Sequence, residues 1–508
     1  MDTADRLDAL DYHELTKHSV ASVSSNRHFL DWDTQPLPFK LYPHLKPIPL
    51  PRDFSRQQPS ATIDRLTLAR LLHFTGGIMR KKTLADGSEY YFRAAACTGA
   101  LYHIDLYVVC GDVVDLPAGV YHFGPHDFSL RRLRHGDHRR TVVDAGGDHP
   151  ALASAPVILV CTSTFWRNAW KYQARTYRHC FWDNGTMLAN LLEVAATAQV
   201  PAEIVLGFAD TRVNELLALD TDREVALSLV ALGDRAVAAI DTPRPSNEQS
   251  DVQQPHNDNF RGEIDYPAIR AAHAGSSFES GEEARRWRTQ TFKRVVPEPT
   301  GKLIPLSPPG GPVSARMEEV IARRGSARYF LQQPIEYEAL AHLLRSALPV
   351  PAADWLPREE ADTGESSLND IYLIVNAVDG LAPGAYVCRR DLQALELLKA
   401  GDFRRQAGHL DLGQELAADA SVNFYCLSDL VLVDSHLGNR GYRAAALEAA
   451  IVGGRIYLAA YALGLGATGL TFFDDDVTQF FSPHAAGKEV MFLTAVGRTG
   501  SSRRKASR

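Results

Sequence analysis

One short segment places two guanidiniums and a hydroxyl at alternate positions: Arg324-Gly325-Ser326-Ala327-Arg328. An extended chain or the first turn of a helix would direct Arg324, Ser326 and Arg328 at one anion. Forked guanidiniums donate paired hydrogen bonds that suit phosphate oxygens, so the segment is a candidate phosphate site. An arginine-rich helix start on a solvated surface explains the same pattern, and this alternative stays open on the segment alone.

A glycine-rich stretch, Gly464-Leu465-Gly466-Ala467-Thr468-Gly469-Leu470, lies further along the same part of the chain. Glycines there let backbone N–H groups approach a planar ligand, which makes Ala467, Thr468, Gly469 and Leu470 candidate contacts. A helix C-cap followed by a turn is the alternative. The basic tail around Arg504 is a candidate third contact to the anion, or a frayed terminus.

The chain contains an internal repeat at one constant shift, which is the separation of Leu116 from Leu381. The segment LPAGVYHFGPHDFSLRRLRHGDHRR from Leu116 aligns with LAPGAYVCRRDLQALELLKAGDFRR from Leu381. The same shift pairs Asp105 with Asp370, Arg175-Thr176-Tyr177-Arg178 with Arg440-Gly441-Tyr442-Arg443, and Phe208 with Phe473. Matches at one shift that extend over so much of the chain indicate two copies of one fold.

Each copy has the same order of predicted elements. A helix with regularly spaced leucines precedes a β-rich stretch, then a strand, a long apolar helix and a final strand, EVALSLVALG or EVMFLTAVG. The long helix is apolar on too many positions to have a wet face, so we expect it at the centre. The pattern predicts an α+β sandwich with a mixed or antiparallel sheet.

Composition shifts divide the chain into five parts. We expect an N-terminal arm in residues 1–60, domains in 61–237 and 313–500, a linker in 238–312 and a basic tail in 501–508. The arm and the linker are interrupted by prolines, and the linker contains one predicted short helix, within GEEARRWRTQTFKR.

Bulk properties exclude several classes of function. The net charge of −7 and pI near 6.2 provide no basic field for nucleic acid. No uninterrupted apolar run is long enough to span a membrane, and the acidic N-terminus does not resemble a secretion signal. Six scattered cysteines and eighteen histidines without ligand spacing predict no metal site and a cytoplasmic protein with reduced thiols.

These motifs together resemble the nitroreductase superfamily, and within it the SagB-type dehydrogenases that oxidise azolines in ribosomal peptide natural products. The shared features are the R-x-S-x-R opening, the glycine turn and two segments of the first copy. These are Arg93-Ala94-Ala95-Ala96-Cys97-Thr98-Gly99-Ala100-Leu101-Tyr102 and Lys171-Tyr172-Gln173-Ala174-Arg175-Thr176-Tyr177-Arg178. The resemblance implies FMN at the interface of two such domains, so the fused copies would form a pseudo-dimer within one chain.

The copies differ in a complementary way. Only the second has the arginine motif and the glycine turn; only the first has Thr98-Gly99-Ala100-Leu101-Tyr102 and Lys171-Tyr172. By resemblance, the second copy would hold the phosphate and ring edge while Cys97, Thr98 and Gly99 cover the flavin. Complementary loss predicts one working flavin site per chain. The family's Pro-Ser is Ala96-Cys97 here, which replaces a hydroxyl contact with a thiol.

The resemblance also assigns catalysis to Lys171 and Tyr172. Aromatising an azoline removes a proton and a hydride, and flavin N5 accepts the hydride. Burial or a neighbouring cation such as Arg175 would lower the pKa of Lys171 toward that of a useful base. A surface lysine beside a core tyrosine is the alternative for this pair.

Three functions therefore remain in play. The first is an FMN-dependent dehydrogenase acting on a small-molecule or peptide-derived heterocycle. The second is an NAD(P)H-dependent nitro- or quinone-reductase. The third is a catalytically silent partner in a biosynthetic complex, which the change to Ala96-Cys97 favours.

Overall fold

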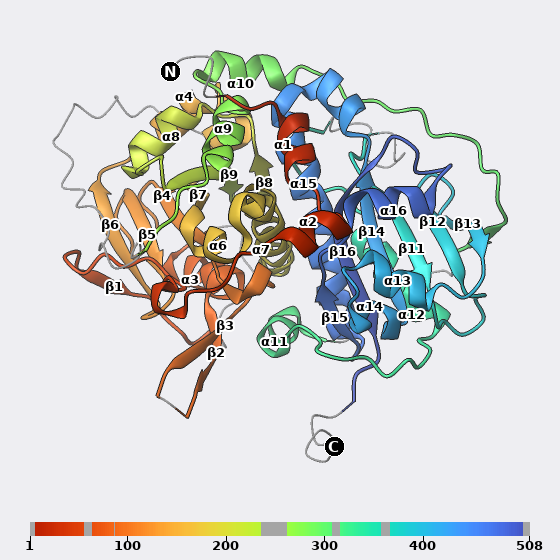
Figure 1. The fold of residues 1–508 in the computed structure, drawn as a ribbon. Helices are drawn as coiled ribbons and strands as arrows, with labels where there is room; N and C mark the ends of the chain where they lie inside the picture. Colours follow the sequence, from red (N-terminus) through yellow and green to blue (C-terminus); the bar gives the residue numbers. More distant parts are fainter. Residues whose placement is uncertain are drawn as a thin grey trace.

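The computed structural model describes residues 6–54, 63–85, 87–234, 262–306, 315–356 and 366–500, and these form two lobes (Figure 1). Each lobe contains a seven-stranded sheet in which every neighbouring pair of strands is antiparallel. The first sheet has the order β1 (Pro47–Pro49), β6 (Ser129–His135), β5 (Gly119–Gly124), β4 (Ile104–Cys110), β7 (Val157–Thr164), β9 (Glu224–Leu232) and β8 (Ala202–Val205). The second has the order β10 (Leu303–Pro305), β13 (Ala394–Ala400), β12 (Gly384–Arg389), β11 (Asp370–Val375), β14 (Val422–Ser428), β16 (Glu489–Gly497) and β15 (Gly466–Gly469). The predicted α+β fold is confirmed, and the two sheets have the same topology.

Helices flank both sheets, and a separate hairpin of β2 (Ile78–Thr83) and β3 (Glu89–Arg93) projects from the first lobe (Figure 1). In the first lobe and the N-terminal segment the helices are α1 (Ala9–Leu15), α2 (Val20–Ser25), α3 (Arg65–Gly76), α4 (Arg139–Ala145), α5 (Pro150–Ser154), α6 (Phe165–Tyr172), α7 (Thr176–Ala198) and α8 (Asp210–Leu217). Later in the chain they are α9 (Pro267–Gly275), α10 (Gly281–Arg288), α11 (Met317–Arg323), α12 (Tyr337–Ala347), α13 (Arg404–Leu410), α14 (Glu415–Asp419), α15 (Leu430–Ala462) and α16 (Asp474–Phe481).

Helices α7 and α15 cross at the centre of the molecule and join the lobes (Figure 1). A Cβ added to Gly185 would lie 2.5 Å from the Ala450 Cβ, and one added to Gly454 would lie 2.6 Å from the Ala189 Cβ. Both contacts join positions that the repeat makes equivalent, as expected at a pseudo-twofold axis. Glycine on one helix opposite alanine on the other lets the backbones approach closely.

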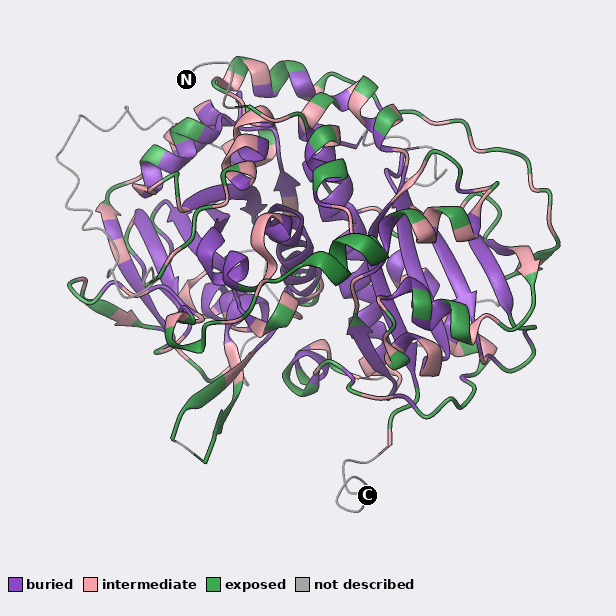
Figure 2. Ribbon diagram, viewed as in Figure 1, coloured by how far each residue is buried: buried purple, intermediate pink, exposed green. Residues whose placement is uncertain are grey.

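The centre of α15 is buried on all sides because sheet and helices cover it (Figure 2). Among the described residues α15 is the one helix long and apolar enough to cross a membrane, and 89% of that window is buried inside the protein. A kink at Gly438 (φ 58°) corresponds to Gln173 (φ 52°), the break between α6 and α7. The central helix predicted from the sequence is therefore present in both copies.

Segments expected to lie outside the domains each complete a sheet. The proline-rich arm supplies β1 and the linker supplies β10, each a short strand paired antiparallel at one sheet edge. The linker also forms two helices, α9 and α10, where one was predicted, and α10 begins with a capping box between Ser280 and Glu283. Prolines fit these edge strands because one side of an edge strand has no ladder partner.

Two buried arginines of each copy hold an aspartate of the other copy. In the first copy Arg175 and Arg178 donate to the carboxylate of Asp474, at 3.1 and 2.6 Å. The pseudo-symmetric contacts, both 2.8 Å, are those of Arg440 and Arg443 with Asp210. The R-x-x-R part of the Lys-Tyr segment is therefore an interlobe clamp that both copies retain.

The register of the repeat slips by one position at these aspartates. The constant shift would pair Asp210 with Asp475, yet its structural counterpart is Asp474, and β8 and β15 begin at the same slipped register. Arg440 lies 4.7 Å from the Phe208 ring and Arg175 lies 5.5 Å from the Phe472 ring. The structural partner of Phe208 is thus Phe472, and the predicted pairing with Phe473 was wrong by one position.

Candidate active site

The arginine motif lies at the seam between the lobes, directly after α11. Arg324 is buried, and its Nε and Nη2 donate to the carbonyls of Ala94 (2.9 Å) and Arg93 (3.0 Å) in the other lobe. This side chain ties the second copy to the segment Arg93–Tyr102 of the first. Much of its donor capacity is used by the protein, so Arg324 positions the seam as well as adding charge to it.

The rest of the motif lies beside β15. The Ala327 N–H donates to the Ala467 carbonyl at 2.9 Å, and the Ser326 hydroxyl lies 3.4 Å from the Tyr457 hydroxyl. Ser326 and Arg328 are exposed. Among the residues that the structure describes, no carboxylate pairs with Arg328, which makes it the available cation of the motif.

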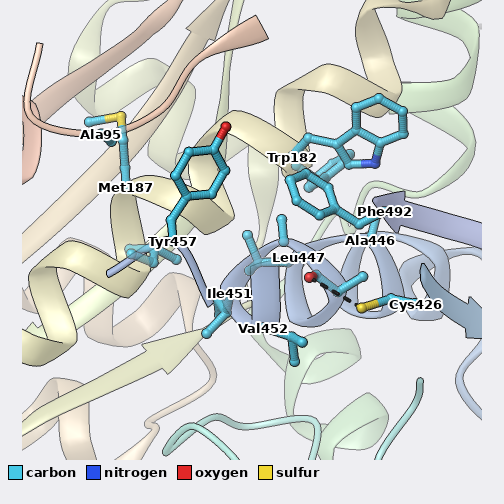
Figure 3. Close-up of a cluster of buried hydrophobic side chains, with 14 of the residues drawn as sticks. Ala95, Trp182, Met187, Cys426, Ala446, Leu447, Ile451, Val452, Tyr457 and Phe492 are labelled. Atoms are coloured by element: carbon cyan, nitrogen blue, oxygen red, sulfur yellow. Dashed lines mark hydrogen bonds between the residues drawn. The ribbon is translucent and has the colours of Figure 1, made fainter. Parts of the chain in front are cut away.

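Tyr457 of α15 was not predicted from the sequence, yet it connects the two motifs of the second copy. Its hydroxyl accepts the Gly469 N–H and its ring lies 5.9 Å from the Arg324 guanidinium. The side chain extends between Ala95 and Met187 of the first lobe on one side and Trp182 and Phe492 on the other (Figure 3). In the sequence Tyr457 looks like any core aromatic of a long apolar helix. Its role becomes visible only from its contact with the glycine turn.

Cys97, Thr98 and Gly99 form a loop held by a buried carboxylate, Asp183 of α7. Asp183 accepts from the Cys97 thiol (3.0 Å), from the Thr98 N–H (2.9 Å) and from the Thr98 hydroxyl (2.7 Å). His103 adds a fourth contact at 2.8 Å. The thiol and the hydroxyl are therefore occupied within the protein, and burial raises the pKa of Cys97 well above its usual value.

Asp183 was missed in the sequence because it lies in an apolar helix. One signal was available: the constant shift of the repeat places Glu448 at the same point of the second copy. The Glu448 carboxylate accepts the N–H groups of Leu368 and Asn369 at 3.0 and 3.1 Å. A buried carboxylate at this point of the central helix is therefore common to both copies.

Lys171 and Tyr172 end α6 beside the Cys97–Gly99 loop. Gly99 has φ +62°, and a Cβ there would lie 2.9 Å from the Tyr172 hydroxyl oxygen. The Lys171 ammonium lies 5.3 Å from the Tyr172 ring centroid. Burial lowers the pKa of Lys171, and Arg328 of the other lobe lowers it further. The cation near Lys171 is thus Arg328 rather than the expected Arg175, which is committed to Asp474.

Hydrogen-bond donors from both lobes meet at this seam. A Cβ built on Gly325 or Gly469 would come no nearer than 3.7 Å to another atom, so neither glycine is crowded by its neighbours. Arg328 and Lys171 lie at the same seam, and a small cavity lined by Ala95, Ala96, Cys97, Asp183 and Met187 adjoins it. Thr468 is buried, and Gly469 and Leu470 follow at the rim. Arg504 lies outside the described residues.

The pseudo-symmetric position in the other lobe is closed. Residues Ala352 and Asp354 lie along β8, with the Ile204 N–H donating to the Ala352 carbonyl at 2.9 Å. The Asp354 carboxylate accepts the N–H groups of Leu206 and Gly207, both at 2.8 Å. These N–H groups correspond to those of Leu470 and Thr471, so the protein's own carboxylate occupies this position.

No group of histidine, cysteine, aspartate and glutamate able to hold a metal occurs within the described ranges. The fold is that of a tandem α+β protein, in which the candidate site residues of the two repeats meet at the seam. Residues 321–498 match the model of the Nitroreductase family. The first lobe repeats the fold of that segment.

Known proteins resemble the chain to different extents. A putative nitroreductase from Anabaena variabilis ATCC 29413 is 28% identical, with a TM-score of 0.80, over 97% of this chain and 99% of that one. A putative nitroreductase of Methanocaldococcus jannaschii is 26% identical over 145 residues, 28% of this chain and 72% of the relative. The E. coli microcin synthetase McbBCD complex with truncated pro-MccB17 bound contains a chain 20% identical, with a TM-score of 0.30, over 46% of this chain and 90% of that one. The Anabaena protein shares the whole tandem arrangement.

Proposed function

We propose that the chain is an FMN-dependent oxidoreductase with one flavin site per molecule, composed from both lobes. The observation that carries this proposal is the convergence of Arg328 and Gly469 of one lobe with Lys171 and the Cys97–Gly99 loop of the other. The closed position at Asp354 supports a single site. FMN, when bound, supplies a two-electron acceptor.

The residues at the seam have separable roles in this proposal. Arg328 and the Ser326 hydroxyl bind the phosphate, and the backbone from Ala467 to Leu470 borders the ring. Asp183 keeps the Cys97–Gly99 loop in place. Lys171, with its lowered pKa, removes a proton from substrate at an atom that Tyr172 helps to orient.

For the substrate we propose a thiazoline or oxazoline within a peptide-derived molecule, oxidised to the azole. This rests on the Lys171-Tyr172 pair and its resemblance to the SagB-type enzymes. An NAD(P)H-dependent nitro- or quinone-reductase is the second candidate, favoured by the full-length likeness to the putative nitroreductase from Anabaena. In that reaction Lys171 or Tyr172 would donate a proton to the reduced product.

Flavin counting tests the proposal first. We expect about one FMN per chain after incubation with excess FMN and gel filtration, measured from the absorbance of released flavin against protein. Two FMN would refute the single composite site but leave the flavoenzyme intact. No FMN would refute the enzymatic proposal and indicate the silent partner of a biosynthetic complex.

Turnover then separates the two chemistries. A thiazoline-containing peptide tested with oxygen, and nitrobenzene or benzoquinone tested with NADPH, report the two candidate reactions. We expect Lys171→Ala to abolish thiazoline oxidation while flavin absorbance is retained. The matched control is His436→Ala, at the equivalent position of the second copy, where activity should persist. Equal losses in both variants would contradict a catalytic role for Lys171.

A further inference from the structure

A second cavity, of about 350 Å³, lies in the C-terminal lobe between the linker and one end of the sheet. Its walls come from linker residues 292–297, from the ends of β11 and β12, from the start of α15 and from residues 484–488. No motif in the sequence indicated it, and it shares no lining residue with the seam described above. Its size falls at the lower end of small-ligand sites, roughly 300–1,000 Å³.

The corresponding place in the N-terminal lobe is filled. Asp105, the counterpart of Asp370, is buried against Arg167 at 2.8 Å, and Lys40 from the arm reaches Glu224 and the Tyr107 hydroxyl. All five of these side chains are buried. The cavity is therefore a property of one lobe and not a consequence of the shared fold.

One end of the cavity carries more positive than negative charge. Asp370 is paired with two cations, Arg294 at 2.7 Å and Lys488 at 2.6 Å, which hold the pKa of its carboxyl well below the usual range despite burial. Lys488 also donates to the Tyr372 hydroxyl at 3.0 Å, and that hydroxyl lies 2.9 Å from His484 Nδ1. Two cations on one carboxylate attract a further anion.

The remaining wall combines an apolar part with five charged residues, namely Lys293, Arg389, Arg390, Asp391 and Asp429, and Arg389 is itself paired with Asp391 and Glu396. Leu368, Val387, Cys388 and Phe292 are buried side chains that border the cavity, and Leu432 of α15 is half-buried there. A ligand that satisfies both ends has one anionic head and a short apolar body. An inorganic ion would leave the apolar wall uncovered, and a neutral apolar molecule would leave the cations without a new partner.

We propose that this cavity binds a small amphipathic carboxylate, with its head on Arg294 and Lys488 and its apolar body against Leu432 and Val387. Carboxylates suit this end because charge-assisted hydrogen bonds from an ammonium and a guanidinium are stronger than neutral ones. The proposal is independent of the flavin site.

Octanoate is the probe, titrated by calorimetry into the FMN-saturated full chain, with octanamide as the neutral analogue. We expect one octanoate per chain and binding of octanamide weaker by about tenfold or more, as for loss of a charge-assisted contact. Leu432→Trp, which fills the cavity from a half-buried position, should abolish binding without changing the flavin content.

Charge is tested by Lys488→Met, with Arg223→Met, at the equivalent position of the first copy, as the matched control. Lys488→Met should weaken octanoate binding about tenfold, and Arg223→Met should leave it unchanged. Octanamide binding as tightly as octanoate, or octanoate binding that survives Leu432→Trp, would overturn the proposal. If Lys488→Met does not fold, the amide comparison and the cavity-filling variant decide the matter.

Discussion

Asp354 lies in a buried environment that disfavours the ionised form of its carboxyl. Its side chain reaches across the seam to the N–H groups of Leu206 and Gly207, and the residue is only 9% exposed. Burial raises the pKa of this carboxyl from 3.8 to about 6, outweighing the two N–H groups and the nearby guanidinium of Arg288. At neutral pH the folded protein therefore holds an ionised carboxylate at a cost.

The direction of the pH effect follows from this raised value. A folded state that binds a proton more tightly than the unfolded chain loses stability as pH rises from about 4 through 6. A rise from 3.8 to about 6 corresponds to about 3 kcal/mol in full at about 1.36 kcal/mol for each pKa unit. Between pH 5 and pH 8, roughly half of this, about 1.5 kcal/mol, is lost.

Asp354→Asn removes the titration while keeping the shape of the side chain. We expect the free energy of unfolding of the variant, relative to the parent, to increase by about 1.5 kcal/mol from pH 5 to pH 8. Urea unfolding of the FMN-saturated protein at both values measures it, and Asp379→Asn, at an exposed position, controls for loss of one charge. A variant that becomes relatively less stable at pH 8 would refute the reasoning, because the N–H groups would then outweigh burial.

Two further predictions concern the seam. Arg328→Gln removes the cation that helps to lower the pKa of Lys171, so the rise of turnover with pH should move to higher pH; an unmoved pH–rate profile would exclude this coupling. Gly99→Ala places a Cβ 2.9 Å from the Tyr172 hydroxyl oxygen at a backbone φ of +62°. We expect a loss of about 1 kcal/mol in the free energy of unfolding and reduced turnover with FMN retained. Unchanged turnover would show that the tyrosine does not depend on this glycine.

Much of the architecture could be predicted because the sequence contains two copies of the same pattern of elements. The repeat predicted two copies of one fold, and the apolar character of α7 and α15 predicted central helices. The paired copies did not reveal β1 and β10, since such short strands containing prolines have neither the length nor the alternation that indicates a strand. Edge strands of this kind are specified by the neighbouring strand rather than by their own residues.

Only those candidate site residues that stand in recognisable polar or glycine-rich motifs could be predicted. Arg324, Arg328 and the Cys97–Gly99 loop were recognised by residue type, but the contact of Arg324 with two carbonyls depends on how the lobes meet. Asp183 and Tyr457 lie in long buried helices, where a single polar atom does not disturb the apolar pattern. Asp354 becomes informative only when its carboxylate is seen on the strand edge of the other lobe.

Comparison of the two copies distinguishes residues that both copies retain from residues that occur in only one copy. The arginine clamps on Asp474 and Asp210, and the buried carboxylates Asp183 and Glu448 of the central helices, occur in both copies, so they serve the shared fold. Lys171 occurs in one copy alone, and it meets the arginine motif of the other copy only at one of two equivalent seams. At the second seam a carboxylate fills the space instead. Under the proposed single site, duplication followed by loss on opposite sides would produce this pattern, because one complete site needs only one contribution from each copy. The differences between the repeats, more than their similarities, therefore mark the positions at which we expect the proposed chemistry.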